Sequence, residues 1–514
     1  MKKILLPLLL LSSVWGCSVN PVTGKNELSF VSPQQEVAIG EKNYIPSRQS
    51  QGGDYYLDPE LQFYVRNVGQ KLAAVSDRPN LPYDFVVLNN PTPNAWALPG
   101  GKIAINRGLL IHLEDEAQLA AVLGHEIVHA AARHGATQMT RGTLMNVGLL
   151  AVGIGTQGKQ GAQLYGMASQ LGAAAWMAKY GRNDELESDK YGMHYMSKAG
   201  YDPWGAVKLQ ETFVKLSEGR QSDFLSGLFA SHPPSLQRVK ENRYLAQQLP
   251  KGNRYRERYQ RAIAQLKKDS DAYKAQDQAL KALRNKESKA ALDYLDKAVA
   301  LQPREGQFWE LRGYAWQMMD NKGNAEKAFG TAINKNPNYF SPYLARGILR
   351  YEQGNKSAGK ADITRSYELL PTPAASYYLG ESAMDNKRYK EAANYYQQAS
   401  QDRGELGKKA RQRLTGLKLQ LEPHTFIQTR TALDSSGKLV VAVTNTSPAA
   451  MTGVRLQIVE RVNVLSAVNH KALTVSGTLG AGQQVVVNTG LGPFDSTEAA
   501  SRFVVQVTAA KAVQ

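Results

Sequence analysis

Residues 119–135, LAAVLGHEIVHAAARHG, decide how this 514-residue chain is interpreted. Apolar and small residues surround His125, Glu126 and His129, so the segment is predicted to be a buried helix. Histidines four positions apart lie on one helical face, where both imidazoles can reach one tetrahedral Zn²⁺ ion. Glu126 would lie beside the open coordination position. The alternative is a pair of ordinary core histidines, and a third ligand downstream decides between the two interpretations.

A candidate third ligand lies in residues 180–199, YGRNDELESDKYGMHYMSKA. Glu185 and Asp189 are also four positions apart, so both carboxylates are predicted to project from one face of a second helix. Glu185 would complete a three-ligand site with one exchangeable water. Asp189 would accept the Nδ1–H of a ligand histidine and fix its ring. A solvated acidic face is the alternative, and it is the weaker interpretation beside an HEXXH helix.

These motifs together resemble those of the HtpX- and BepA-type zinc endopeptidases. The resemblance covers residues 20–245 and rests on NAWALPGGKIAINRGLL (94–110), HEIVH (125–129) and GRNDELESD (181–189). It implies a mainly helical, zincin-like peptidase domain with one Zn²⁺ ion per chain. The ligands that it implies are His125, His129 and Glu185, and the general base is Glu126.

Two further residues are candidates for the site through this resemblance. The family carries an S/T-H-P sequence whose histidine is implicated in regulating the zinc site, and here the sequence is SHPP at 231–234. His232 could occupy the exchangeable position at rest, or donate to the oxyanion during catalysis. Alternatively it caps the following helix. Arg182 is a candidate to hold a carboxylate or the oxyanion. The remaining histidines have no partner motif and are predicted to be structural or solvated: His112, His134, His194, His424 and His470.

The first 17 residues resemble a bacterial lipoprotein signal. A short basic start precedes ILLPLLLLSSV, which is too short to span a bilayer as a mature helix, and Cys17 is the only cysteine. We expect a lipidated Cys17, export to the periplasm and anchoring at the outer membrane, which Ser18 favours over the inner one. A plain secretory signal is the alternative. The NPVTG sequence at 20–24 is interpreted as a tether without chemistry of its own.

The peptidase region, residues 18–250, is predicted to contain a small sheet. Helices are expected from about Ser32 and over 59–75, then a strand over 83–89 and a hairpin formed by 94–98 and 102–106. The hairpin edge at Asn94, Ala95, Trp96 and Ala97 is a candidate to pair with an extended substrate backbone. A purely structural hairpin is the alternative. Residues 140–179 are predicted to be two helices, forming either a lid or client-binding surface or part of the core.

Residues 251–420 have the pattern of tetratricopeptide repeats. Pro303, Pro337 and Pro371 stand 34 residues apart, and glycines recur at nearly the same interval, at 313, 347 and 380, where a first helix must let its partner approach closely. We expect about four helix pairs between residues 270 and 414, forming a groove for peptides or partner proteins. Residues 421–514 alternate in hydropathy over about six short segments, which predicts a small β-sandwich that serves as an accessory docking module. The fold class is therefore α+β.

The sequence thus predicts a periplasmic zinc endopeptidase that cleaves misfolded or stalled envelope proteins. The competing interpretation is a non-proteolytic chaperone or assembly factor for outer-membrane proteins, with a latent zinc site. The repeats are expected to contact unfolded envelope polypeptides, and the outer-membrane assembly machinery is a further candidate partner. The net charge of +17 is dispersed and the protein is predicted to be exported, so we expect no nucleic-acid partner.

Overall fold

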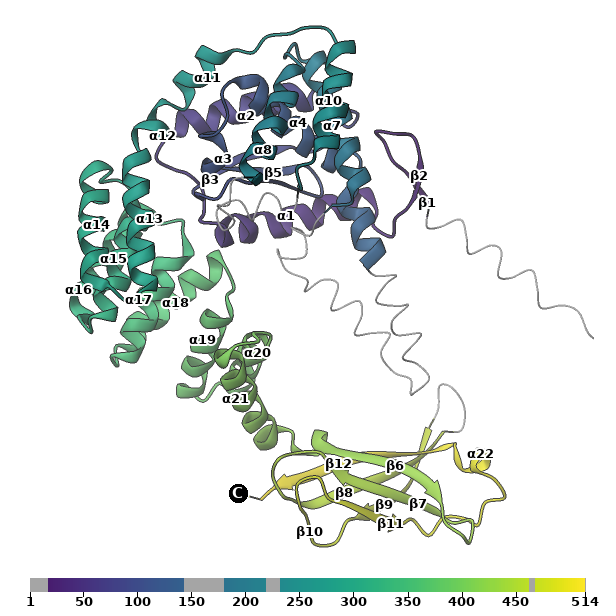
Figure 1. Ribbon diagram of the computed structural model, residues 1–514. Coiled ribbons are helices and arrows are strands. Elements are labelled where there is room, and N and C mark those ends of the chain that lie inside the picture. Colours follow the sequence, from purple (N-terminus) through teal and green to yellow (C-terminus); the bar gives the residue numbers. More distant parts are fainter. Residues whose placement is uncertain (1–16, 143–179, 219–231, 462–466, 514) are drawn as a thin grey trace, which may run out of the picture. The chain divides into compact units, whose positions relative to one another are not determined.

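The computed structural model describes residues 17–142, 180–218, 232–461 and 467–513 (Figure 1). The chain forms two compact units, residues 1–370 and 371–514, which divide inside the predicted repeat region. The predicted signal peptide and nearly all of the predicted lid segment, 143–179, lie outside the described residues. Among the described residues, no helix is long and apolar enough to cross a bilayer.

The first described element is a short antiparallel ribbon of β1 (Cys17–Val19) and β2 (Asn26–Leu28), with Cys17 opposite Leu28. The NPVTG sequence forms the turn between these strands. Asn20 Oδ1 accepts hydrogen bonds from the backbone N–H groups of Val22 and Thr23, at 2.9 and 3.2 Å. This is the turn geometry that asparagine favours, and it fixes the direction in which the Asn20 amide nitrogen points.

A three-stranded sheet lies at the centre of the peptidase region. It consists of β3 (Asp84–Leu88), β4 (Ala95–Leu98) and β5 (Lys102–Asn106) in the order β3-β5-β4. The predicted β4–β5 hairpin is present, and β3 pairs parallel to β5. Successive side chains point to opposite faces. Phe85, Val87 and Ile105 therefore join the main core, whereas Trp96 and Leu98 pack on the other face with Tyr44 of α1.

A further helix begins at His134, and seven helices with fully described bounds surround this sheet, with α1 on one face and α2 and α4 on the other (Figure 1). They are α1 (Pro33–Ser50), α2 (Pro59–Ala73), α3 (Arg107–Leu110), α4 (Glu116–Ala131), α7 (Arg182–Lys198), α8 (Trp204–Glu218) and α10 (Leu236–Gln248). Asp115 caps α4 by accepting from the backbone N–H of Gln118, and every residue of α4 is buried. The predicted buried HEXXH helix is therefore present.

Two glycines allow α4 and α7 to pack closely beside the site. A Cβ atom on Gly124 would lie 3.1 Å from the carbonyl oxygen of Gly192, and one on Gly192 would lie 3.0 Å from the backbone nitrogen of His125. Any larger side chain would push the helices apart. This contact lies beside the histidine pair, so it determines how far the carboxylates of α7 are from the imidazoles of α4.

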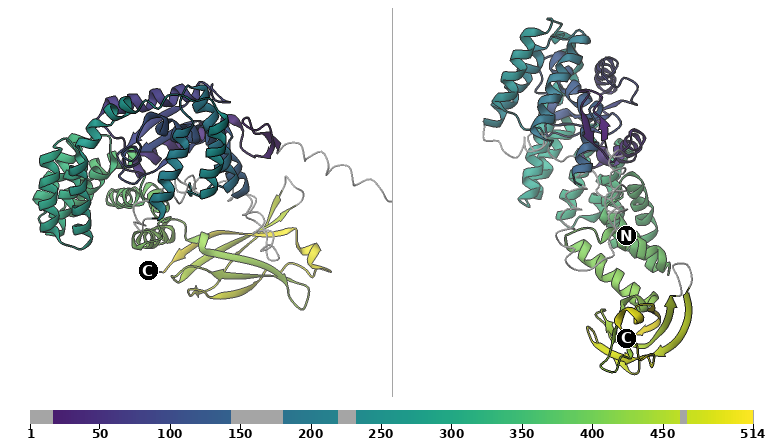
Figure 2. Two further views of the ribbon diagram at one scale, coloured as in Figure 1. Left: turned by 45° about the horizontal axis from the view of Figure 1, so that its top comes forward. Right: turned by 90° about the vertical axis from the view of Figure 1, so that its right-hand side faces the viewer.

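The helical repeats follow as antiparallel pairs (Figure 2). After α11 (Arg256–Ala262) and α12 (Ala264–Lys268), the helices are α13 (Ser270–Arg284), α14 (Ser288–Leu301), α15 (Gly306–Met318), α16 (Lys322–Lys335), α17 (Phe340–Glu352), α18 (Lys356–Leu369), α19 (Pro373–Asp385), α20 (Tyr389–Ala399) and α21 (Glu405–Leu421). A Cβ on Gly313 would lie 2.3 Å from the Phe329 ring, and one on Gly380 would lie 2.7 Å from the Tyr396 ring. The repeat glycines therefore allow close helix pairing, as predicted.

Within the first unit, the first repeats pack directly on the peptidase sheet. Glu305 is fully buried and accepts hydrogen bonds from Asn89 Nδ2 at 2.8 Å and from the Tyr273 hydroxyl at 2.9 Å. Arg107 Nε donates to Asn89 Oδ1 at 2.8 Å, and its guanidinium lies over the Tyr273 ring. The residues that follow β3 and β5 are thus held by the repeats, so residues 1–370 form one unit.

The second unit ends in the predicted β-sandwich. After η3 (Pro423–Phe426), one sheet contains β6 (Ile427–Leu433), β7 (Leu439–Asn445) and β11 (Gln484–Asn488). The other contains β8 (Met451–Arg461), β9 (Ala467–Thr474), β10 (Thr478–Leu479) and β12 (Phe503–Ala512), and α22 (Thr497–Ala500) precedes β12. Val441 and Val443 of the first sheet pack against Met451 and Leu456 of the second, which closes the core between them.

Candidate metal centre

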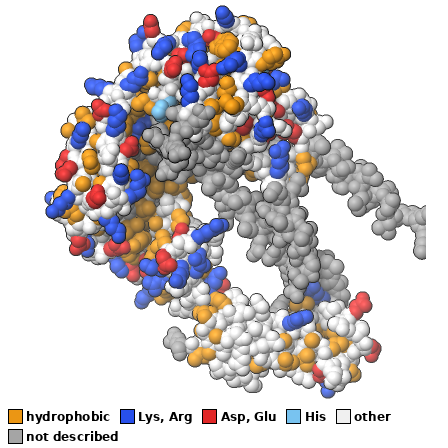
Figure 3. Space-filling view, viewed as in Figure 1, with side chains coloured by type: hydrophobic (Ala, Val, Ile, Leu, Met, Phe, Trp, Pro, Cys, Tyr) orange, Lys and Arg blue, Asp and Glu red, His pale blue; other side chains and the backbone are white. Residues whose placement is uncertain are grey.

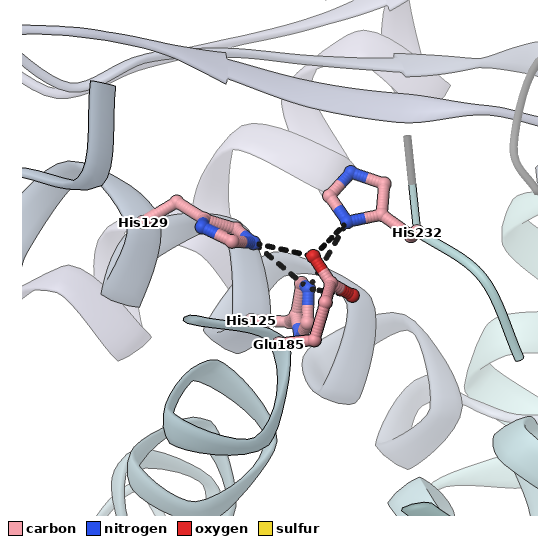
Figure 4. Close-up of side chains that lie close together, drawn as sticks. All are labelled: His125, His129, Glu185 and His232. Carbon is pink, nitrogen blue, oxygen red and sulfur yellow. Dashed lines mark hydrogen bonds and ion pairs between the residues drawn. The ribbon is translucent and has the colours of Figure 1, made fainter. Parts of the chain in front are cut away.

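Four side chains from three parts of the fold converge in one buried cluster (Figure 4). His125 and His129 come from α4, Glu185 comes from the first turns of α7, and His232 lies just before α10. All four are buried, and each offers one ligand atom within 4.8 Å of the others. The fold thus brings together the predicted ligands His125, His129 and Glu185, although His125 and Glu185 are 60 residues apart in sequence. His232 is a fourth member of the cluster.

The distances within the cluster are short. His125 Nε2 lies 3.0 Å from His129 Nε2, and the two Glu185 oxygens lie 3.5 and 3.4 Å from these nitrogens. His232 Nδ1 lies 2.9 Å from Glu185 Oε1 and 3.3 Å from His125 Nε2. Three imidazoles and a carboxylate therefore face one small volume.

Asp189 contacts His125 at the nitrogen where an orienting carboxylate is expected from the sequence. Its Oδ1 lies 2.9 Å from His125 Nδ1, and Arg238 from α10 donates to both Asp189 oxygens at 2.6 and 2.7 Å. Arg238 Nη1 also lies 2.8 Å from Glu185 Oε2. One buried guanidinium therefore holds the third candidate ligand and the carboxylate that orients the first.

The charges of the cluster shift its pKa values in opposite directions. Burial lowers the pKa of the His125 imidazole, but the negative charges of Glu185 and Asp189 outweigh burial and raise it to about 10. Burial also lowers the pKa of His129, here well below its ordinary value. For Glu185, burial is outweighed by the neighbouring His232 and His125, which hold the pKa of the carboxyl well below its usual range. The cluster therefore attracts positive charge.

The donor set fits a metal ion. The Nδ1 atoms of His125 and His129 have partners on the outer side, Asp189 Oδ1 at 2.9 Å and His134 Nδ1 at 2.8 Å, so their Nε2 atoms are the ones that face the cluster. A proton or a metal ion between these two nitrogens satisfies both of them. Two imidazoles and a carboxylate with one open position is the ligand set of catalytic zinc sites. His125, His129 and Glu185 could hold the ion, and His232 Nδ1 could take the fourth position.

Glu126 lies beside the cluster and contacts it only through His232. Its Oε1 is 3.5 Å from His232 Nε2, and its Oε2 is buried without a hydrogen-bond partner among the described residues. Burial raises the pKa of the Glu126 carboxyl above its ordinary value. A carboxylate in this environment accepts a proton readily, which is the property required of a general base.

A small cavity opens beside Glu126 and His232. Its apolar lining includes Leu109, Val122, Met193, Met196, Leu209 and Phe213. Gln210 Oε1 and Asn242 Nδ2 also belong to lining residues, and neither has a hydrogen-bond partner in the described part of the chain. The cavity therefore places a mostly apolar surface next to the candidate base Glu126.

The candidate substrate strand β4 borders the same site. Ala95 lines the cavity, and the backbone N–H of Asn106 donates to the Asn94 carbonyl at 2.9 Å. Because hydrogen bonding alternates along an antiparallel pair, the backbone groups of Ala95 and Ala97 point away from β5, as a substrate-pairing edge requires. The Trp96 side chain packs on the opposite face of the sheet, where its ring contacts that of Tyr44.

Arg182 is the one predicted site residue that the structure places elsewhere. It is exposed, and its guanidinium donates to Gln237 rather than to a carboxylate of the cluster. Arg182 is the first residue of α7, one turn before Glu185, and its side chain is exposed at this start of the helix. Arg238, rather than Arg182, holds the carboxylates of the cluster.

Two residues near the cluster were missed in the sequence. His134, predicted to be structural or solvated, is buried beside His129, and Tyr180 stacks on the His129 ring with 3.8 Å between ring centroids. The only local signal for His134 was its position five residues after His129. Tyr180 directly precedes the GRNDELESD motif, but no spacing rule connects it with a histidine 51 residues earlier.

Comparisons with known proteins agree with this site. Residues 59–246 match the model of "Peptidase family M48". The beta-barrel assembly-enhancing protease of Escherichia coli O157:H7 is 30% identical over 243 residues, which cover 45% of this chain and 47% of that protein. The mitochondrial metalloendopeptidase OMA1 of Schizosaccharomyces pombe is 33% identical over 226 residues, covering 43% of this chain and 64% of that protein.

A thermophilic TPR protein of Thermus thermophilus aligns with 42% of this chain and 100% of its own, with a TM-score of 0.26 and 19% identity.

The region that matches the E. coli relative spans about half of that protein's length. The family match extends from the start of α2 to α10 and includes His125, Glu126, His129, Glu185 and His232. Residues 59–246, which carry the candidate metal centre, are therefore similar to peptidases of family M48.

Proposed function

We propose that this protein is a zinc-dependent endopeptidase of the bacterial envelope. The observation that carries the proposal is the convergence of His125, His129 and Glu185, with a buried Glu126 oxygen that no described residue satisfies beside them. A structural metal site would need no buried base next to its ligands. One Zn²⁺ ion per chain suits this donor set, and a zinc ion bound there would polarise the scissile carbonyl and acidify an attacking water.

The protein's own residues supply the remaining steps. Asp189 holds the His125 ring so that Nε2 faces the site, and Arg238 keeps the Asp189 carboxylate in place. The Glu126 carboxylate takes the proton from the attacking water and then delivers it to the leaving amine. The substrate lies along β4, pairing through the backbone groups of Ala95 and Ala97. Its apolar side chain lies against the apolar surface beside Glu126, so residues that unfolded proteins expose are preferred.

The substrates are misfolded or stalled envelope polypeptides, which the repeats help to recruit. The E. coli relative bears the name of a β-barrel assembly protease, which supports clients among outer-membrane proteins and a contact with their assembly machinery. Lys and Arg side chains are spread among acidic and neutral ones over the described part of the face in Figure 3. A lipid on Cys17 holds the protein at the periplasmic side of the outer membrane.

A second candidate function is an assembly chaperone with a latent zinc site. The observation that favours it is His232, whose Nδ1 is close enough to Glu185 and His125 to occupy the position that an attacking water needs. In that state the site has four protein ligands, like a structural zinc. On this alternative the repeats bind clients and cleavage is absent or needs His232 to move.

One experiment separates the two functions. The purified full-length protein is incubated with an unfolded model protein such as reduced casein, with and without a zinc chelator, and compared with its His232→Ala variant. We expect chelator-sensitive cleavage that becomes faster in the variant while zinc remains bound. Cleavage lost with zinc retained would give His232 the oxyanion role. No cleavage by either protein, with zinc bound in both, would favour the chaperone.

A further inference from the structure

The second candidate ligand, His129, is held on its outer side by another histidine. His129 Nδ1 lies 2.8 Å from His134 Nδ1, and His134 Nε2 lies 3.2 Å from Glu187 Oε1. Glu187 Oε1 in turn accepts from Asn20 Nδ2 at 3.1 Å. His129, His134 and Asn20 are each at most 3% exposed. A continuous chain of hydrogen bonds thus joins the metal-facing imidazole to the N-terminal turn.

Donor and acceptor counting fixes the direction of every bond in this chain. His129 can bind a metal through Nε2 only if its proton is on Nδ1, so this atom donates to His134 Nδ1. His134 Nδ1 must then be unprotonated, which places its proton on Nε2, where it donates to the Glu187 carboxylate. Glu187 has no proton to give and accepts again from the Asn20 amide. One tautomer at each histidine satisfies all three contacts.

Asn20 is itself held in a single orientation. Its Oδ1 is occupied by the backbone N–H groups of Val22 and Thr23, and its Nδ2 also donates to Glu27 Oε1 at 2.9 Å. Glu27 is tied to the helical core because Thr137 donates to its other oxygen at 3.0 Å. The turn therefore presents the amide N–H groups to Glu187 in a fixed place.

We propose that Asn20, Glu187 and His134 are positioning residues for the metal ligand His129, which makes the N-terminal turn a part of the metal centre. The proposal rests on the proposed zinc site. The two ligand histidines of α4 then have different outer partners, a carboxylate held by arginine for His125 and a histidine–glutamate–asparagine relay for His129. The second arrangement spans 167 residues of sequence between Asn20 and Glu187.

The test measures zinc affinity by competition with a chromophoric chelator, using the full-length protein. Outer partners of metal-bound histidines typically contribute about 10- to 100-fold in affinity, and we expect His134→Phe to weaken zinc binding by that factor. His134→Asn keeps an acceptor near His129 Nδ1 and should recover part of the loss. Glu187→Gln and Asn20→Asp should weaken binding in the same direction by about threefold or more.

Asn20→Asp is the decisive variant. Its side-chain oxygen still supports the turn, but it loses the donor and places a negative charge against Glu187. Thr23→Ala is the matched control, because Thr23 belongs to the same turn and its hydroxyl only accepts from the Lys25 backbone N–H. The melting temperature of each zinc-free variant shows whether the fold is intact.

The outcomes separate this inference from the proposed function. Weaker zinc binding in Asn20→Asp and Glu187→Gln, with Thr23→Ala like the wild type, supports the relay. If substitutions at Asn20, Glu187 and His134 all left the zinc affinity unchanged, the relay would be overturned, while the proposed zinc site would stand. A wild-type protein that binds no zinc would instead contradict the proposed function. Equal losses in Thr23→Ala and Asn20→Asp would overturn the relay as well, because the effect would then lie in the folding of the turn.

Discussion

Glu126 stands next to a candidate ligand in the sequence but has a different environment from the ligands. It carries a buried oxygen that no described residue satisfies and lies 3.5 Å from His232, whereas the ligand atoms face one another. Replacing it with Gln preserves its size and leaves the ligand set untouched. We expect Glu126→Gln to retain one zinc per chain and the wild-type melting temperature, while cleavage falls by a factor of about 100 or more.

Zinc content by atomic absorption and casein cleavage by the same preparation check this expectation. Glu185→Ala serves as the contrast, because it removes a candidate ligand and should lower zinc content itself. Comparable cleavage by Glu126→Gln and the wild type would remove the general-base assignment.

Arg238 contributes through charge rather than through contact with a substrate. It is 4% exposed and neutralises both Asp189 and Glu185. In Arg238→Met the two carboxylates lose their buried partner, and breaking a buried ion pair in this way costs about 3–5 kcal/mol. Urea unfolding of the zinc-free protein measures this loss. Arg243→Met on the same helix is the control, since Arg243 forms an exposed pair with Glu211 and should change stability by less than about 1 kcal/mol.

Sequence patterns predicted the members of the buried cluster better than the residues that support them. His125, His129, Glu185 and Asp189 could be found because helical periodicity relates residues four positions apart. Arg238 has no such relation, since it meets Asp189 from 49 residues away on another helix. Arg182 was the arginine closest to the motif in sequence, yet α7 turns its side chain outward. Tertiary packing alone selects between the two arginines.

Among the helices, α15 carries a buried acid that makes the repeats sensitive to pH. Burial raises the pKa of the Glu310 carboxyl to about 7, against hydrogen bonds from Ser341 and Tyr314, and the charge of Glu305 adds to the rise. A folded-state pKa above the unfolded value means that the folded state binds the proton more tightly. The contribution of Glu310 to stability is therefore complete below about pH 4.5 and declines as pH rises through about 7.

Glu310→Gln removes this dependence. Between pH 5 and pH 8, the wild type should lose about 2 kcal/mol of unfolding free energy relative to the variant. Urea unfolding of both proteins at the two pH values, followed by tryptophan fluorescence, measures the difference. The two stability profiles would run parallel if Glu310 were ionised throughout.

Most helices and strands could be predicted from the sequence. Which helices pack together and which strands pair was harder to predict. The glycines at 313 and 380 predicted close helix pairs because a missing Cβ has one clear structural use, and Phe329 and Tyr396 fill that space. The β4–β5 hairpin followed from its turn residues. The parallel strand β3 joined this sheet without a local signal, since parallel neighbours are connected over long distances.

The whole chain combines a peptidase domain, repeats and a sandwich, and the proposed anchor decides where they work. Cys17→Ala should move the protein from the membrane pellet to the soluble periplasmic fraction, because one thioether-linked lipid group is the only proposed attachment. Fractionation followed by immunoblotting checks this, with Ser18→Ala as the control. Retention of Cys17→Ala in a salt-washed pellet would contradict lipidation. Purified, unanchored protein should still cleave casein.

The division at residue 370 shows what the sequence pattern could not separate. The 34-residue period runs without interruption through Pro337 and Pro371, so it predicts one array. The structure instead joins the earlier repeats to the peptidase sheet through Glu305 and Asn89, while the later ones belong to the unit that contains the sandwich. Periodicity describes how neighbouring repeats stack, and it carries no information about which other surface a given repeat contacts.

With the proposed lipid on Cys17, the ribbon of β1 and β2 would set the distance between the membrane and the peptidase unit. Asn20 is fixed in the peptidase unit and Cys17 is paired with Leu28, so a lipid on Cys17 leaves about 10 Å of chain between the headgroups and the body of the domain. The protein could not sample the width of the periplasm as a freely tethered enzyme would. It would remain in a thin layer along the bilayer, and its substrates would be polypeptide chains that stay close to that surface.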